Sequence, residues 1–166
     1  MKMNLIRKAG FLLVCATMVA AGNGTAQNVQ RTSQGIKCAT QGMDVNVEFY
    51  SPTIVRVYKT PSQKSCNKES LVIVKTPEST PVSFGEKGKN VTLSSRLIQV
   101  EVNGGIHFFD SSGQRLLTDK DYGTQFTPFN DAGVPSFNVR QAFLLDKDEV
   151  IYGLGQQQTG KVNQRN

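Results

Sequence analysis

The sequence contains no tryptophan, a single histidine and only three cysteines among its 166 residues. A protein site for zinc needs three or four ligands, and His107 with the two cysteines outside the N-terminal segment supplies too few nitrogen and sulfur donors. Chemistry that depends on a metal centre is therefore not expected.

Nucleotide-binding glycine loops are also absent. Gly153 and Gly155 would need a third glycine at position 158, where the sequence has Gln158, and no helical pattern follows. In the segment 85–89 only two residues separate the glycines, and no Ser or Thr follows the Gly-Lys pair. We therefore expect no nucleotide, and no cofactor of another kind.

Long apolar runs are confined to the N-terminus. Three basic residues precede the apolar stretch 9–21, which is shorter than the roughly 20 residues of a membrane-spanning helix. Small residues then lead to a cleavage position before Gln27. The pattern predicts a signal peptide over residues 1–26, and hence an exported, periplasmic or extracellular protein of a bacterium.

Charge of one sign is not concentrated anywhere in the sequence. The formal net charge is +6, but residues 1–26 contain three of the 19 basic residues and none of the 13 acidic ones, so the remaining chain carries +3. No basic stripe remains, and we expect neither a nucleic-acid partner nor a membrane span. About 140 remaining residues suffice for one domain with a real core.

Cys38 and Cys66 remain after removal of the predicted signal peptide. In an oxidising compartment an even pair favours a disulfide, and two unlinked thiols are the alternative. The strands beside the two cysteines are expected to be adjacent, so a bridge predicts Cα atoms about 4.4–6.8 Å apart.

Strand patterns follow one another in residues 44–166, after a polar leader at 27–43 with room for one short strand. Residues 44–50 alternate between polar and apolar side chains, and 53–58 are rich in β-branched and aromatic residues. Residues 71–74 form a continuous apolar run, which is typical of a strand buried on both faces.

Further strands are predicted along the rest of the chain. Residues 96–103 and 106–110, on either side of Gly104-Gly105, have the pattern of a hairpin; 119–135 reads as a loop, and 137–145 alternates again. No window after the signal peptide shows apolar residues at the 3.6-residue spacing of a helix. The fold class is therefore all-β, as an antiparallel sandwich or a barrel.

Carboxylates are candidates for acid–base chemistry. Asp146, Asp148 and Glu149 lie together in an expected turn between strands, where they form a solvated charge cluster. Asp119 and Asp121 point the same way on an extended chain, yet no apolar neighbour would make one an acid and the other a base. We assign no catalytic residue.

His107 lies within a predicted strand, and its environment depends on the turn before it. A two-residue loop at Gly104-Gly105 places His107 beside Val100 and Val102, whereas a slip of one residue exposes it. In both cases we expect a packed or surface histidine rather than a catalytic one.

Carbohydrate binding by stacking would need exposed aromatic rings. Tyr122, Phe126 and Phe129 lie in the expected loop 119–135 and are the only such group outside clear strands. They are the candidates for substrate binding, and the alternative is that they cap an edge of the sandwich.

The C-terminal stretch carries the most specific pattern. A predicted strand at 150–152 leads into a motif with these members: Tyr152, Gly153, Gly155, Gln156, Asn163 and Arg165. Glycines at alternate positions after a strand indicate a sharp turn or a contact too close for a Cβ. We therefore predict a positive φ or close packing for at least one of the two.

This motif resembles the segment that closes the first half of the N-terminal β-sandwich domain in glycoside hydrolase family 31, which contains α-glucosidases and α-xylosidases. The family's usual wording is Tyr-Gly-(Leu/Phe)-Gly-Glu, so Gln156 takes the place of the commoner Glu. Residues 49–57, with Ser-Pro between two strands, and 109–117, with Phe-Asp-x-x-Gly before Leu-Leu, are similar to earlier segments of that domain. The order and spacing fit over most of residues 44–166.

The resemblance implies a galactose-mutarotase-like sandwich over residues 44–166, incomplete at its C-terminal end. It also implies that two carboxylates of a (β/α)8 barrel outside this chain perform the catalysis. The expected role is that of the non-catalytic N-terminal domain of a secreted α-glycosidase that acts on α-glucosides or α-xylosides. Its partners would be the barrel in the same polypeptide and, through the whole enzyme, an α-glucan or xyloglucan-type oligosaccharide. The alternative is a stand-alone secreted carbohydrate-binding or adhesive sandwich.

Overall fold

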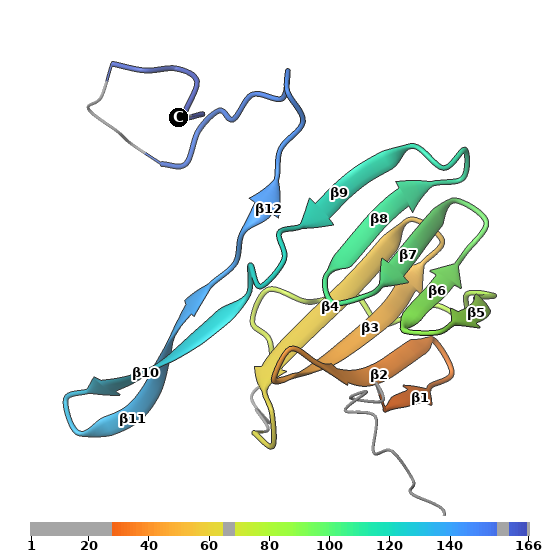
Figure 1. Ribbon diagram of the computed structural model, residues 1–166, viewed down its shortest axis with the longest axis horizontal. Coiled ribbons are helices and arrows are strands. Elements are labelled where there is room, and N and C mark those ends of the chain that lie inside the picture. The colour runs from red at the N-terminus through yellow and green to blue at the C-terminus, as the bar shows by residue number, and fades with distance from the viewer. Residues whose placement is uncertain (1–27, 65–68, 156–159, 166) are drawn as a thin grey trace, which may run out of the picture.

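The computed structural model describes residues 28–64, 69–155 and 160–165, which contain twelve β-strands and no helix. Within that part of the chain, nothing helical is therefore long and apolar enough to cross a membrane. Ten of the strands form two antiparallel sheets, and the other two form a separate ribbon (Figure 1). The antiparallel all-β sandwich expected from the strand patterns is confirmed.

The first sheet has four strands in the order in which they follow along the chain. They are β1 (Val29–Arg31), β2 (Gly35–Thr40), β3 (Met43–Ser51) and β4 (Ile54–Pro61). The period-two pattern of β3 turns Val45, Val47 and Phe49 inward, where none is more than 2% exposed. The opposite face of β3 carries its polar residues.

Residues 27–43 were expected to form a polar leader with room for one short strand. The structure differs, because this segment contains two strands of the first sheet, β1 and β2. Six residue pairs join β2 to β3, and three join β1 to β2. Ile36 and Cys38 alternate inward and are buried, although the segment around them is polar. Backbone pairing with the long strand β3 stabilises β2, although the apolar content of β2 is too low to indicate a strand from the sequence.

The second sheet has six strands in the order β12-β9-β8-β7-β6-β5. Their bounds are β5 (Ser83–Lys87), β6 (Asn90–Ser94), β7 (Ile98–Val102), β8 (Ile106–Asp110), β9 (Arg115–Asp119) and β12 (Phe143–Leu144). Val91, Leu93, Val100, Val102 and Ile106 of this sheet belong to the same buried cluster as the inward residues of β2 and β3. The two sheets therefore pack face to face over one core.

The hairpin between β7 and β8 has a three-residue connection rather than a two-residue one. Val102 pairs with Ile106, and Gly104 in the connection has a φ of +101°. His107 then lies opposite Glu101, on the face away from the core. Of the two registers considered for this hairpin, the structure has the one that turns the histidine outward.

The ribbon consists of β10 (Gln125–Asp131) and β11 (Val134–Arg140), joined by the two-residue turn Ala132-Gly133. Both turn residues have positive φ, 49° and 93°, as a type I′ hairpin turn requires. The expectation of a loop over 119–135 is therefore wrong. Pro128 of β10 is tolerated in a two-stranded ribbon, since each strand has one unpaired edge.

Two expected strands are absent from the described residues. In the apolar run 71–74, Leu71, Val72 and Val74 are 96%, 87% and 94% exposed and form no ladder. An apolar run shows that a segment can be buried but does not show which surface covers it. The segment 150–152 is also irregular, because Ile151 bonds to Asn163 and Gln164 instead of to a strand.

A test of this architecture uses two strand glycines. A Cβ on Gly35 would lie 1.9 Å from the carbonyl oxygen of Val47, whereas a Cβ on Gly85 would have its nearest contact at 3.8 Å. We predict that Gly35→Ala destabilises the full-length protein by about 1–3 kcal/mol through overpacking, and that Gly85→Ala is neutral or slightly stabilising. Thermal unfolding followed by circular dichroism measures both. Equal melting temperatures for the two variants would contradict the close approach of β2 to β3.

Candidate functional site

The carboxylates at the surface are held in turns and ion pairs. The Ser112 hydroxyl and the Gln114 N–H donate to Asp110, at 2.6 and 2.9 Å, and these hydrogen bonds hold the pKa of Asp110 below its usual value. Arg115 pairs with Asp146, whose N–H donates to Glu149. These groups brace turns through hydrogen bonds and an ion pair, which is not the paired environment that a general acid and base need.

Asp119 is buried, whereas Asp121 is exposed. The ammonium of Lys59 in β4 donates to Asp119 Oδ2 at 2.5 Å, to Thr124 Oγ1 at 2.9 Å and to Gln141 Oε1 at 3.1 Å. The second oxygen, Asp119 Oδ1, accepts from Gln141 Nε2 at 3.0 Å. Both carboxylate oxygens are thus occupied, so Asp119 joins the two sheets and does not serve as a free base.

A cavity of about 520 Å³, which we call the open groove, lies between β4 and the second sheet beside this ion pair. Its apolar lining includes Val57, Phe108, Leu117, Phe126, Val139 and Phe143. Lys59, Asp119, Thr124 and Gln141 provide its polar part. The groove is therefore an apolar gap between the sheets with one hydrogen-bonded patch.

The ribbon leaves the sandwich at this polar patch. Thr124 precedes β10 and Gln141 follows β11, and the Thr124 hydroxyl donates to Gln141 Oε1 at 2.6 Å. At Gly123 a Cβ would lie 2.6 Å from the carbonyl oxygens of both Lys120 and Ala142, so only glycine fits. The base of the ribbon is therefore fixed by close packing and by the Lys59 network.

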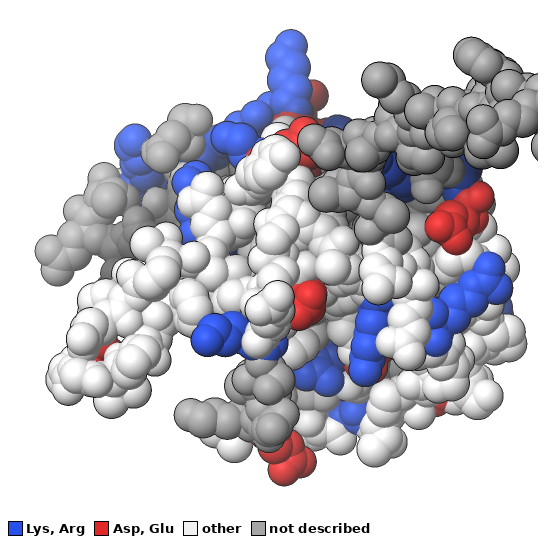
Figure 2. Space-filling view, turned by 60° about the horizontal axis from the view of Figure 1, so that its bottom comes forward, with Lys and Arg blue, Asp and Glu red and all other residues white. Residues whose placement is uncertain are grey.

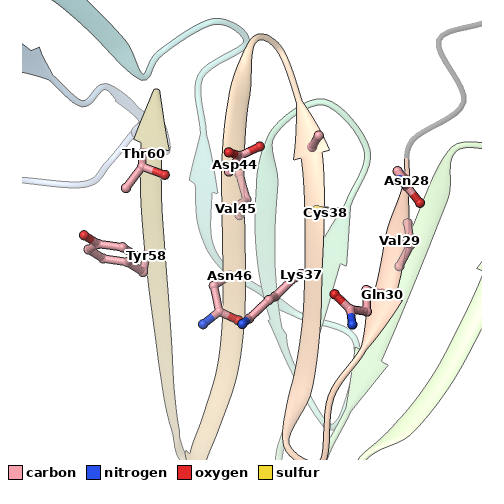
Figure 3. A pocket seen from close by; sticks show the side chains of 11 residues that line it. Asn28, Val29, Gln30, Lys37, Cys38, Asp44, Val45, Asn46, Tyr58 and Thr60 are labelled. Carbon is pink, nitrogen blue, oxygen red and sulfur yellow. The ribbon is translucent and has the colours of Figure 1, made fainter. Parts of the chain in front are cut away.

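A second cavity, of about 660 Å³, lies on the outer face of the first sheet (Figure 3). Its polar lining comes from alternate residues of neighbouring strands: Gln30, Lys37, Asp44, Asn46, Tyr58 and Thr60. Figure 3 shows Lys37 and Asn46 next to each other, as the pairing of β2 with β3 requires. Sequence reasoning overlooked this group, although the alternation of 44–50 already placed Asp44 and Asn46 on the face opposite the core.

The polar cavity can offer hydrogen bonds. Asn46 Oδ1 is buried and lacks a hydrogen-bond partner among the described atoms. Across the described ranges, no three His, Cys, Asp or Glu side chains come together as metal ligands. Cys38 also lines the cavity and is 4% exposed; its predicted partner Cys66 lies outside the described residues, so the disulfide stays a prediction.

The C-terminal motif forms a closed loop. Gly153 and Gly155 have φ values of +86° and +87°, which confirms the predicted need for glycine. Asn163 Oδ1 accepts from the N–H groups of Ile151 and Arg165, at 3.1 and 3.0 Å. Tyr152 is exposed, and Gln156 lies outside the described residues.

Arg165 holds the base of this loop. One of its guanidinium nitrogens donates to the carbonyl oxygens of Asp146, Lys147 and Glu149, at 2.6, 2.7 and 2.7 Å. The backbone of Gln164 also donates to Ile151 at 2.8 Å. Asn163 and Arg165 follow the glycines in the sequence at a distance, but their hydrogen bonds go to the backbone of the segment just before the glycine turn.

The three aromatic candidates for carbohydrate binding are not brought together. Tyr122 is 69% exposed in the turn before the ribbon. Phe126 and Phe129 are three residues apart in β10 and therefore point to opposite faces. Phe126 packs against the core and makes an edge contact with Phe137, whereas Phe129 is 47% exposed. They offer no common stacking platform.

Comparison with known proteins identifies the kind of domain that this sandwich matches. Residues 44–166 match the model of the glycosyl hydrolase 31 N-terminal galactose mutarotase-like domain. An α-xylosidase of Saccharolobus solfataricus is 27% identical over 125 residues, which cover 71% of this chain and 16% of that protein. The chain therefore spans about one sixth of the length of this relative.

A solved structure gives the same result for the fold. The crystal structure of the GH31 α-xylosidase from Xanthomonas citri superimposes with a TM-score of 0.73 and 27% identity, over 82% of this chain and 16% of that one. The fold expected from the resemblance, a galactose-mutarotase-like sandwich, is thereby confirmed.

Removal of one partner from the Lys59–Asp119 pair tests the bracing role. We predict that Lys59→Met destabilises the protein by about 3–5 kcal/mol, because Asp119 is left buried without a counter-charge. The double variant Lys59→Met/Asp119→Leu should recover most of this loss. Lys75→Met, in a pair whose side chains are 43% and 55% exposed, is the control and should cost about 0–1 kcal/mol. Urea unfolding measures all three, and a double variant as unstable as Lys59→Met would contradict the interpretation.

The loop closure can be tested at Arg165. Arg165→Lys keeps the charge but removes the planar group that reaches three carbonyl oxygens, and we predict that local opening becomes easier by about 1–3 kcal/mol. Hydrogen exchange of the Ile151 and Gln164 amides should accelerate accordingly. Arg96→Lys, at an exposed turn, is the control. Unchanged exchange at both amides would show that Arg165 does not close the loop.

Proposed function

The chain belongs to glycoside hydrolase family 31 through its N-terminal galactose mutarotase-like domain, and we propose that it is the non-catalytic N-terminal domain of a secreted α-glycosidase. The observation that carries this proposal is the family match over residues 44–166 in a chain that spans only 16% of each relative. The remaining length of such an enzyme is ample for a catalytic barrel.

The chemistry of the described carboxylates supports a non-catalytic role. Retaining and inverting glycosidases both need two carboxyl groups on either side of the scissile bond, one of them protonated. Here the buried carboxylate, Asp119, is neutralised by Lys59, and the carboxylate of Asp110 is held in its ionised form. The domain therefore contributes structure, and the catalytic carboxylates belong to the rest of the polypeptide.

Both relatives are named as α-xylosidases, which favours an α-xyloside over an α-glucoside as the substrate of the whole enzyme. A xyloglucan-type oligosaccharide is then the natural class of ligand. We also propose that the enzyme is exported, on the basis of the signal peptide predicted for residues 1–26.

The activity test compares two products of the gene. We predict that the longer protein hydrolyses an aryl α-xyloside faster than an aryl α-glucoside, and that residues 27–166 alone hydrolyse neither. Release of the aryl group measures both. Hydrolysis by residues 27–166 alone would contradict the non-catalytic role, and a gene that ends at residue 166 would favour the stand-alone binding module.

The same short product tests whether the sandwich is complete. In the described part β4 pairs only with β3, which leaves one of its edges unpaired, and the rim of the open groove exposes Leu117 to 38%, Phe143 to 45% and Val139 to 66%. An unpaired edge beside an uncovered apolar surface favours association. We therefore predict that residues 27–166 aggregate and bind a hydrophobic dye, as measured by gel filtration and fluorescence. A monomer with cooperative thermal unfolding would contradict this.

A further inference from the structure

The register of the ribbon separates its residues into two unlike faces. Phe126 pairs with Val139, Pro128 with Phe137 and Asn130 with Pro135, so these six side chains share one face. Five of the six are apolar. We call this set the apolar face of the ribbon.

The opposite face of the ribbon is mainly polar. Its members are Gln125, Thr127, Phe129, Asp131, Val134, Ser136, Asn138 and Arg140. Both charged residues of the ribbon, Asp131 and Arg140, lie on this side. Figure 2 shows the ribbon as a projection from the sandwich that is almost free of charged side chains.

The apolar face is continuous with the open groove. Phe126 and Val139 line the groove at the base of the ribbon, and Pro128, Phe137 and Pro135 extend the same face toward the tip. Phe137 is 39% exposed and Val139 is 66% exposed, although both belong to the face that begins in the core. One apolar surface therefore runs from the sandwich along the whole ribbon.

A two-stranded ribbon of this kind needs a cover. An isolated hairpin is only marginally stable in water, and exposed apolar surface of this extent marks an interaction site. Each strand also contains a proline, Pro128 or Pro135, which removes a donor and discourages the addition of a third strand at an edge. The ribbon is thus suited to contact through its face.

Among possible occupants, a carbohydrate fits poorly. Sugar rings stack on exposed aromatic planes and bond to polar groups beside them, but the exposed aromatics Phe129 and Phe137 lie on opposite faces. The apolar face offers one exposed ring among prolines and a valine. Its complement is another apolar protein surface without charge.

We propose that the apolar face of the ribbon docks against the remainder of the same polypeptide, outside these 166 residues. This rests on the proposed function, since the chain spans only 16% of the length of its relatives and the greater part of such a protein lies elsewhere. A covalently attached surface is present at an effective concentration in the millimolar range, so a small apolar contact is enough. The Lys59 network and Gly123 hold the ribbon at a fixed angle, which lowers the entropy lost on docking.

Hydroxyl-radical footprinting tests the proposal without a mutation. It uses the full-length protein, meaning the longer gene product that includes the polypeptide outside these 166 residues. In the described residues Phe137 and Phe129 are similarly exposed, 39% and 47%, and they lie on opposite faces. We expect Phe137 to be oxidised at least about fivefold more slowly than Phe129, because only Phe137 is covered. Rates within twofold of each other would overturn the proposal.

Two further arms identify the occupant. If the protection of Phe137 disappears when the protein is diluted to a monomer, a second copy is the cover; if it appears only when a xyloglucan oligosaccharide is added, a sugar is the cover. Either result overturns docking within the same polypeptide. Protection that persists in the monomer without sugar supports it.

Matched variants give a second measurement. Phe137→Ser/Val139→Ser changes the apolar face, and Phe129→Ser/Val134→Ser changes the opposite face at residues that are 47% and 62% exposed. We expect the first pair to lower the melting temperature of the full-length protein by several degrees more than the second, and equal shifts would contradict the proposal. Glycosidase activity tests the proposed function separately. An inactive protein in which Phe137 is protected would support the docking and contradict the proposed function. An active protein in which Phe137 is unprotected would support the proposed function and contradict the docking.

Discussion

The structure depends on two apolar sheet faces that cover each other. Side chains alternate along every strand, so Val45, Val47 and Phe49 can be buried only if Val91, Val100 and their neighbours lie opposite them. This closure is complete over β2, β3, β6 and β7. Between β4 and β9 it is not, because Leu117 and Phe143 remain partly exposed around a cavity of about 520 Å³. The sandwich is therefore closed on one side and open on the other.

The Lys59–Asp119 pair stands at the boundary between the closed core and the open groove. A buried ion pair adds little net stability compared with apolar residues of the same volume, but removing one partner is costly. The pair therefore favours the one arrangement of the chain in which Lys59 and Asp119 are in contact. Here the arrangement includes both sheets and both ends of the ribbon, since Thr124 and Gln141 complete the hydrogen bonds of the ammonium. Hydrogen bonds are directional and apolar contacts are not. The angle of the ribbon is thus set by polar atoms, whereas its apolar face is left for another surface.

Local patterns predicted the parts of the fold that depend on neighbouring residues. The inward residues of β3 follow from period two, and the positive φ of Gly153 and Gly155 follows from residue type, because glycine adopts it at little cost. Contacts between distant segments were not predictable in this way. Lys59 and Asp119 are sixty residues apart, and an isolated lysine or aspartate carries no sign of its partner. Arg165 binds backbone carbonyls, which every residue has. The prediction of a buried strand at 71–74 was wrong for the same reason, since burial depends on a covering surface and not on the apolar run itself.

Outside the two sheets, the described chain from Lys120 to Arg165 is fixed by two separate sets of polar contacts. One is the network of Lys59 at the base of the ribbon, and the other is the hydrogen bonding of Asn163 and Arg165 at the base of the C-terminal loop. Backbone hydrogen bonds accompany both sets: Lys120, Gly123 and Ala142 bond to one another at the ribbon, and Gln164 donates to Ile151 at the loop. In each case the segment beyond the base exposes apolar residues, Phe137 and Val139 in the ribbon and Tyr152 and Leu154 in the loop. Apolar side chains held outward on rigid bases lose little entropy when a surface covers them. Under the function that we propose, these rigid bases would orient the domain against the rest of the enzyme.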